Sequence, residues 1–159
     1  MSRPFERPKA APLPPPQQPL LGSVPRATPA LPRAQAISAA VATVGFDWPS
    51  VEGSREKLTE ELGELDRAAR SGDRAAVEQE LGDVLFAVVN LARHLGVDAE
   101  RALCTTCDKF EARFAHVERR ALSVHGDWPR DACGAPTRGL PLEELDGYWD
   151  EAKREEQGG

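Results

Sequence analysis

The residues best suited to chemistry in this sequence are two acidic pairs. Glu61 and Glu64 are three residues apart in LTEELGEL, and Glu80 and Asp83 have the same spacing in QELGDVLF. On a helix, residues three apart lie about 60° from each other around the axis, so each pair projects from one side. A short turn at residues 71–73 would make the two segments antiparallel neighbours. All four carboxylates could then meet at one point.

Such a cluster predicts a bound divalent cation. Two carboxylates about 5 Å apart repel each other by roughly 3 kcal/mol at an effective dielectric of 20. Oxygen ligands suit Mg²⁺, or Mn²⁺ in its place, whereas Zn²⁺ prefers histidine and cysteine. Magnesium in turn suits a triphosphate substrate. The alternative is that both pairs merely solvate exposed helix faces.

The elements that must position these carboxylates are helices. Apolar residues recur at spacings of three and four over residues 37–44, 58–69, 77–95, 103–124 and 142–149. Asp73 and Asp98 are suitable N-caps, Gly96 is a suitable C-terminal stop, and Pro141 suits a first helical turn. Each helix has one apolar stripe, so we expect an antiparallel bundle. Its core would be thin, which favours a homodimer.

Proline content marks the ends of this domain. Residues 1–22 contain seven prolines, which predicts a disordered tail. We place the helical domain at 23–155, with an irregular lead-in at 23–33, a loop at 125–140 and a disordered end at 156–159.

Composition excludes several function classes. The net charge of -6 and the lack of a basic run argue against nucleic acid or a membrane surface as the partner. No apolar run is long enough to span a membrane and no signal peptide is recognisable, so we expect a cytoplasmic protein with reduced thiols. Cys104 and Cys107 form a CxxC inside a predicted helix, with Cys107 in its apolar seam. We interpret them as packing residues, and the three histidines match no metal-ligand spacing.

Five blocks together resemble a known family. They are VGFDWPSV, KLTEELGEL, EQELGDVLFAVVNLARHLGV, DKFEARFAHVE and LDGYWDEAK. From about residue 24 to 153 they are similar to the C-terminal catalytic domain of MazG nucleotide pyrophosphohydrolases. The resemblance implies an all-α NTP pyrophosphatase fold, a dimer, and Mg²⁺-dependent hydrolysis of an NTP or dNTP to a nucleoside monophosphate and pyrophosphate. Nucleotide-pool clean-up is the implied role.

The family signature EExxE followed by ExxD is complete here. The resemblance implies that Glu61, Glu64, Glu80 and Asp83 are the metal ligands. Which carboxylate accepts a proton from water is open, and we favour Glu61. Glu60 points about 100° away from Glu61, which favours an indirect or merely solvated role.

The remaining candidates would bind the nucleotide. The resemblance places Asn90 near the nucleotide and assigns Lys109 and Arg113 to the phosphates. The alternatives are an amide that bonds between helices and surface ion pairs of Lys109 and Arg113 with Asp108 and Glu111. Lys57, one turn before Glu61, falls on the same face.

Trp149 and Lys153 correspond to family positions that close over the nucleotide. The alternative is a tryptophan that only fastens the last helix. Two rival functions also stand: a catalytically silent dimerisation module, and a pyrophosphatase specialised for dUTP or dCTP.

Overall fold

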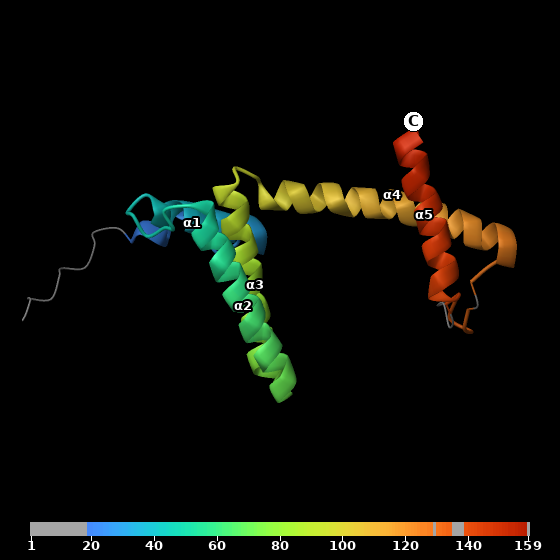
Figure 1. Ribbon diagram of the computed structural model, residues 1–159, viewed down its shortest axis with the longest axis horizontal. Coiled ribbons are helices and arrows are strands. Elements are labelled where there is room, and N and C mark those ends of the chain that lie inside the picture. The colour runs from blue at the N-terminus through green and yellow to red at the C-terminus, as the bar shows by residue number, and fades with distance from the viewer. Residues whose placement is uncertain (1–18, 129, 135–138, 159) are drawn as a thin grey trace, which may run out of the picture. The chain divides into compact units, whose positions relative to one another are not determined.

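A computed structural model describes residues 19–128, 130–134 and 139–158 of the chain. Within these residues the fold is all-helical, which confirms the expected class (Figure 1). The elements are η1 (Leu20–Ser23), α1 (Ala30–Ala42), α2 (Val51–Ser71), α3 (Arg74–His94), α4 (Ala99–His125) and α5 (Leu142–Gly158). None of these helices combines the length and hydropathy needed to cross a bilayer.

The chain divides into two compact units, Met1–Asp98 and Ala99–Gly159. The domain predicted over 23–155 therefore extends over both. Most of the proline-rich tail predicted for 1–22 lies outside the described residues, whereas residues 20–22 belong to η1.

The first unit is built on the hairpin of α2 and α3, with α1 packed against α3 (Figure 1). Gly72 closes α2 in the left-handed conformation, with φ 74°. Asp73 then caps α3, because its Oδ1 accepts hydrogen bonds from the N–H groups of Ala75 at 2.9 Å and Ala76 at 3.3 Å. The N-cap predicted at Asp73 is confirmed, and the tight turn sets the two acidic pairs side by side.

The end of α3 is equally well defined. Gly96 has φ 69°, and its N–H donates to the Arg93 carbonyl at 3.0 Å. The N–H of Val97 donates to the Ala92 carbonyl at 2.8 Å. Together these bonds form a Schellman motif, which confirms the predicted stop at Gly96 and leaves Arg93 and His94 in the last turn of α3.

Two predicted helix boundaries are wrong. Helix α1 begins at Ala30, inside the segment expected to be irregular, with Pro29 as N-cap and Pro32 in the first turn. Proline is tolerated there because first-turn N–H groups have no partner within the helix. Helix α5 continues to Gly158 and so includes residues 156–158, which were expected to be disordered. Strong helix formers such as Arg154, Glu155 and Glu156 explain the extension.

The apolar seams predicted for the two longest segments are only partly buried. In α3 the buried side chains are Val84, Ala87 and Val89, of which only Val84 belongs to the predicted seam. Other seam residues are exposed: Leu81, Val88, Leu95, Leu103, Cys107, Phe110, Phe114 and Val124. Units of two or three helices give each helix few covering neighbours, so much of each stripe stays uncovered within the chain.

The second unit has a small core between α4 and α5. Val117, Ala121 and Tyr148 are buried there, and Trp149 is among the partly buried side chains that pack on them. An ion pair between Arg120 and Glu151, at 2.9 Å, joins the two helices outside this core. The structure thus confirms that Trp149 packs the last helix against its neighbour.

Candidate metal and nucleotide site

Three carboxylates from neighbouring helices meet in the first unit. Glu61 and Glu64 come from α2 and Glu80 from α3, and one carboxylate oxygen of each lies within 4.8 Å of the others. Glu61 is buried, with 7% of its surface exposed, and the other two are partly exposed. Asp83 is not part of this group. It lies one turn along α3 and lines the same pocket as Glu61.

Electrostatics leave this cluster short of positive charge. Desolvation, followed by the negative charges of Glu64, Asp83 and Glu61, raises the pKa of Glu80. Glu64 pairs with Arg67 at 3.0 Å. In the part of the chain that the structure describes, Glu80 has no ion-pair partner. A set of oxygen donors that repel one another fits a hard divalent cation.

Lys57 supplies the positive charge nearest to Glu61. Its Nζ lies 2.7 Å from Glu61 Oε1 and 3.1 Å from Glu60 Oε1. These contacts, with Glu61 the stronger, raise the pKa of Lys57. The structure therefore places Lys57 beside Glu61, paired with two carboxylates. The side chain of Glu60 is 58% exposed and pairs with Lys57, and Glu60 is not one of the three clustered carboxylates.

A pocket of about 440 Å³ opens beside the carboxylates, within the size range of small-molecule sites. Its walls come from α1, the α1–α2 loop, α2 and α3. The apolar lining includes Val41, Phe46, Trp48, Phe86 and Ala87, and the polar lining includes Ser38, Asp47, Lys57, Glu61, Asp83 and Asn90.

The loop residues of this pocket were not among the predicted site residues. Phe46 is 80% exposed and Trp48 is 45% exposed. A Cβ added at Gly53 would lie 3.1 Å from Trp48 Cε3, so this glycine lets the indole rest directly on α2. The signal that could have found them is the pair of aromatic residues flanking Asp47 in VGFDWPSV.

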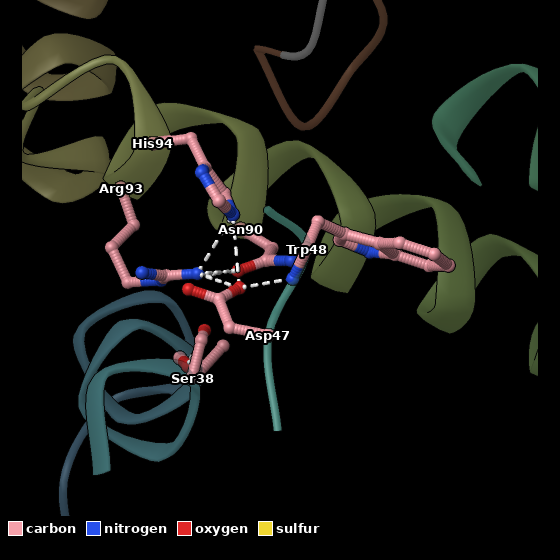
Figure 2. Close-up of polar contacts among 7 residues, drawn as sticks. Ser38, Asp47, Trp48, Asn90, Arg93 and His94 are labelled. Atoms are coloured by element: carbon pink, nitrogen blue, oxygen red, sulfur yellow. Dashed lines mark hydrogen bonds and ion pairs between the residues drawn. The ribbon is translucent and has the colours of Figure 1, made fainter. Parts of the chain in front are cut away.

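Asp47 ties this loop to the end of α3 (Figure 2). Its Oδ1 accepts hydrogen bonds from Arg93 Nη2 and, at 2.9 Å, from the backbone N–H of Trp48, and His94 Nε2 lies 2.9 Å away. Burial raises the pKa of Asp47, but the contacts with Arg93, His94 and Trp48 outweigh it and lower the pKa overall. His94, for which the sequence showed no ligand spacing, is thus part of a loop anchor.

Four predicted nucleotide contacts lie in the second unit. Arg113 binds Glu156 through two donors, Nε to Oε1 at 3.0 Å and Nη2 to Oε2 at 2.7 Å. Its guanidinium also lies 5.6 Å from the centroid of the Trp149 ring. Lys153 pairs with Asp150 at 2.7 Å, and Lys109 is exposed.

The alternative that paired Arg113 with Asp108 or Glu111 is wrong, because its partner is Glu156 on α5. The structure joins Arg113 to Trp149 in one unit, and Lys57 and Asn90 to the carboxylates in the other.

The three cysteines are outside the metal-binding group found among the described residues. Cys104, Cys107 and Cys133 are all free and exposed, so the expected burial of Cys107 in an apolar seam is wrong. Among the residues that the structure describes, the group of histidine, cysteine or acidic side chains close enough to share a metal is the glutamate cluster.

Comparison with known proteins agrees with this geometry. Residues 50–118 match the MazG nucleotide pyrophosphohydrolase domain, a stretch that covers α2, α3 and most of α4. The chain is 43% identical over 142 residues to the nucleoside triphosphate pyrophosphohydrolase of Escherichia coli K12, covering 88% of this chain and 51% of that protein. It is 40% identical over 133 residues to the nucleoside triphosphate pyrophosphohydrolase/pyrophosphatase MazG of Thermotoga maritima, covering 84% of this chain and 48% of that protein. The chain thus spans about half the length of these curated relatives. The stretch of the chain that holds the acidic cluster is thus similar to the MazG nucleotide pyrophosphohydrolase domain.

Proposed function

We propose that this protein hydrolyses nucleoside triphosphates to nucleoside monophosphates and pyrophosphate, with Mg²⁺ held by Glu61, Glu64, Glu80 and Asp83. The observation that carries the proposal is the convergence of three carboxylates from two helices beside a pocket large enough for a nucleoside. The names of the relatives, nucleoside triphosphate pyrophosphohydrolases, support the same reaction. Nucleotide-pool clean-up is the role we propose for it.

The reaction consumes one water and breaks the bond between the α and β phosphates. A bound divalent cation would neutralise charge on the phosphate oxygens and lower the pKa of a coordinated water. Glu61 is our candidate for the group that accepts the water's proton. It is the most buried carboxylate of the cluster, and its Oε1 lies 2.7 Å from Lys57 Nζ.

The pocket would take the nucleoside. Phe46, Trp48 and Phe86 supply apolar surface on which any of the bases could pack. Lys109, Arg113, Trp149 and Lys153 are proposed as nucleotide-binding residues, as the resemblance to the family implies. Arg113 would exchange the carboxylate of Glu156 for phosphate oxygens, which present the same two-pronged acceptor geometry.

We also propose that the protein is a homodimer. Exposed apolar residues on α3, among them Leu81 and Val88, and on α4, among them Phe110 and Phe114, support this proposal, because a second copy of the chain could cover them. Sedimentation of micromolar protein should show the dimer, and a monomer over the whole concentration series would contradict it.

The test of function is pyrophosphate release from a panel of NTPs and dNTPs, including dUTP and dCTP, with Mg²⁺ or EDTA. Glu61→Gln and Glu80→Gln should each lose activity by several orders of magnitude while keeping their helical content. Glu78→Gln is the matched control, since Glu78 is an exposed carboxylate of α3 outside the cluster. Full activity of Glu80→Gln would refute the metal site, and an inactive wild-type protein across the panel would favour a silent dimerisation module.

A further inference from the structure

Arg93 connects two residues of the pocket that are far apart in the sequence. Its Nε and Nη2 donate hydrogen bonds to Asn90 Oδ1 at 3.1 and 2.9 Å, and Nη2 also donates to Asp47 Oδ1. Figure 2 shows the Asn90 amide oxygen and the Asp47 carboxylate meeting at the Arg93 guanidinium. Asp47 belongs to the α1–α2 loop and Asn90 to α3, and both line the pocket.

This arrangement determines which end of the Asn90 amide faces Arg93. A guanidinium has five N–H donors and no acceptor, so only the amide oxygen can bind it. The orientation therefore follows from chemistry and does not depend on how the nitrogen and oxygen atoms are assigned. The Asn90 NH₂ group must point away from Arg93, and it makes no hydrogen bond with any residue that the structure describes.

Asp47 keeps Arg93 in this position. The side chains of Arg93 and Asp47 are 18% and 21% exposed, so their ion pair is partly shielded from water. The contacts with His94 and with the Trp48 backbone N–H reach the same oxygen, Oδ1, and so hold the carboxylate in place. Without Asp47, Arg93 would keep the Asn90 amide and the His94 ring, 3.0 Å away, as partners but would lose its carboxylate partner, and it would be free to turn toward solvent, which would release the amide.

The place of Asn90 on α3 indicates which part of a ligand it meets. Asn90 is seven residues beyond Asp83, which corresponds to about 10 Å along the helix axis. Phosphates held near the carboxylates would leave the nucleoside at this depth of the pocket. The neighbouring walls Trp48, Phe86 and Ala87 are apolar. The side-chain acceptors in the pocket lining are the paired Asp47, the hydroxyl of Ser38, which donates to the Ala34 carbonyl, and the carboxylates Glu61 and Asp83.

We propose that Asp47 and Arg93 are positioning residues that lock the Asn90 amide, so that Asn90 donates to an uncharged acceptor on the sugar or base of the nucleotide. This inference rests on the proposed function and adds to it that Asn90 is the donor and the nucleotide the acceptor in one hydrogen bond. Asn90 would touch the substrate, whereas Asp47 and Arg93 would act through Asn90.

The decisive variant is Asn90→Asp. It keeps an oxygen acceptor for Arg93, so the fold should be retained, but it removes the NH₂ donors. We expect KM for the Mg–NTP complex to rise about 10- to 100-fold with kcat changed about threefold or less, because a donor lost to a neutral acceptor weakens ground-state and transition-state binding alike. An unchanged KM for Asn90→Asp in a folded protein would overturn the proposal.

Arg93→Gln and Asp47→Asn test the positioning role. Each should raise KM, by about tenfold for Arg93→Gln, and Arg93→Gln should add little in the Asn90→Asp background if it acts through Asn90. Equal and additive effects in that double variant would refute the coupling. Arg70→Gln is the control, because Arg70 is exposed in α2 and its loss changes the net charge by the same one unit.

A change of substrate distinguishes an acceptor on the sugar from one on the base. If the acceptor is a sugar hydroxyl, the penalty of Asn90→Asp should disappear with the 2′,3′-dideoxy triphosphate of the same base, and if it is on the base the penalty should persist. Calorimetric binding of a nonhydrolysable triphosphate with Mg²⁺ repeats the comparison without turnover. A wild-type protein that binds but does not hydrolyse would therefore refute the proposed function, while equal binding by wild type and Asn90→Asp would refute the inference.

Discussion

Replacing Lys57 with methionine should make the stability of the protein depend more strongly on Mg²⁺. Lys57 Nζ lies 2.7 Å from Glu61 Oε1, which corresponds to roughly 6 kcal/mol of attraction at an effective dielectric of 20. The Lys57 side chain is 37% exposed, so solvent screening reduces the net effect to about 1–2 kcal/mol. Lys57→Met keeps most of the side-chain volume but removes the cation that pairs with Glu61, which then lies beside Glu80 and beside Glu64 with its partner Arg67.

In EDTA we therefore expect the melting temperature of Lys57→Met to be about 2–8 °C below that of the wild-type protein. Saturating Mg²⁺ supplies the missing positive charge at the same carboxylates, so the difference should shrink to less than half. The raised pKa of Lys57 keeps the amine charged throughout the neutral range, where its stabilising contribution is fully present, and this contribution is lost only in strong alkali.

The assay is thermal or urea unfolding of both proteins in EDTA and in a Mg²⁺ titration, without nucleotide. Lys109→Met is the matched control, because Lys109 is exposed on α4 and outside the cluster, and it should show no Mg²⁺-dependent difference. If the gap between Lys57→Met and wild type is the same in EDTA and in Mg²⁺, then Lys57 and the cation do not share these carboxylates and the electrostatic argument fails.

Three further predictions concern the first unit. Ser54→Ala should raise the free energy of unfolding in urea by about 1 kcal/mol, since the buried Ser54 hydroxyl has no partner among the described residues. Ser38→Ala should lower it by about 1 kcal/mol, because the Ser38 hydroxyl donates to the Ala34 carbonyl at 2.8 Å. Equal effects of the two substitutions would contradict this explanation. In EDTA at neutral pH, Glu80→Gln should have a higher melting temperature than the wild-type protein. A raised pKa of Glu80 means that the folded state binds more protons than the unfolded chain, so wild-type stability falls as pH rises from the unfolded to the folded pKa. The higher melting temperature of Glu80→Gln should disappear below the ordinary glutamate pKa and should reverse in saturating Mg²⁺. If it persists in acid, the ionised Glu80 carboxylate is not what destabilises the wild-type protein. Asp73→Ala should cost about 1 kcal/mol, measured as a lower urea midpoint with unchanged Mg²⁺ response.

Features that depend on a few neighbouring residues were predictable from the sequence. Helical periodicity, the turn that ends α2, the Asp73 cap and the Gly96 stop are local, because each involves residues within about one or two helical turns. The meeting of Glu61 and Glu64 with Glu80 also follows from local information, since a tight turn between two helices places their facing sides in contact.

The remaining features required the tertiary structure. Whether Leu81 or Val88 is covered depends on which helices pack against α3. Helical periodicity identifies the apolar face of a helix but not the number of helices that cover it. The contact between Asp47 and Arg93 joins residues 46 positions apart, and Arg113 meets Glu156 across 43 positions. Spacing along one helix says which side chains share a face. Only the packing of different segments decides which ionic partner each side chain meets, because that choice depends on distances that close when the chain folds.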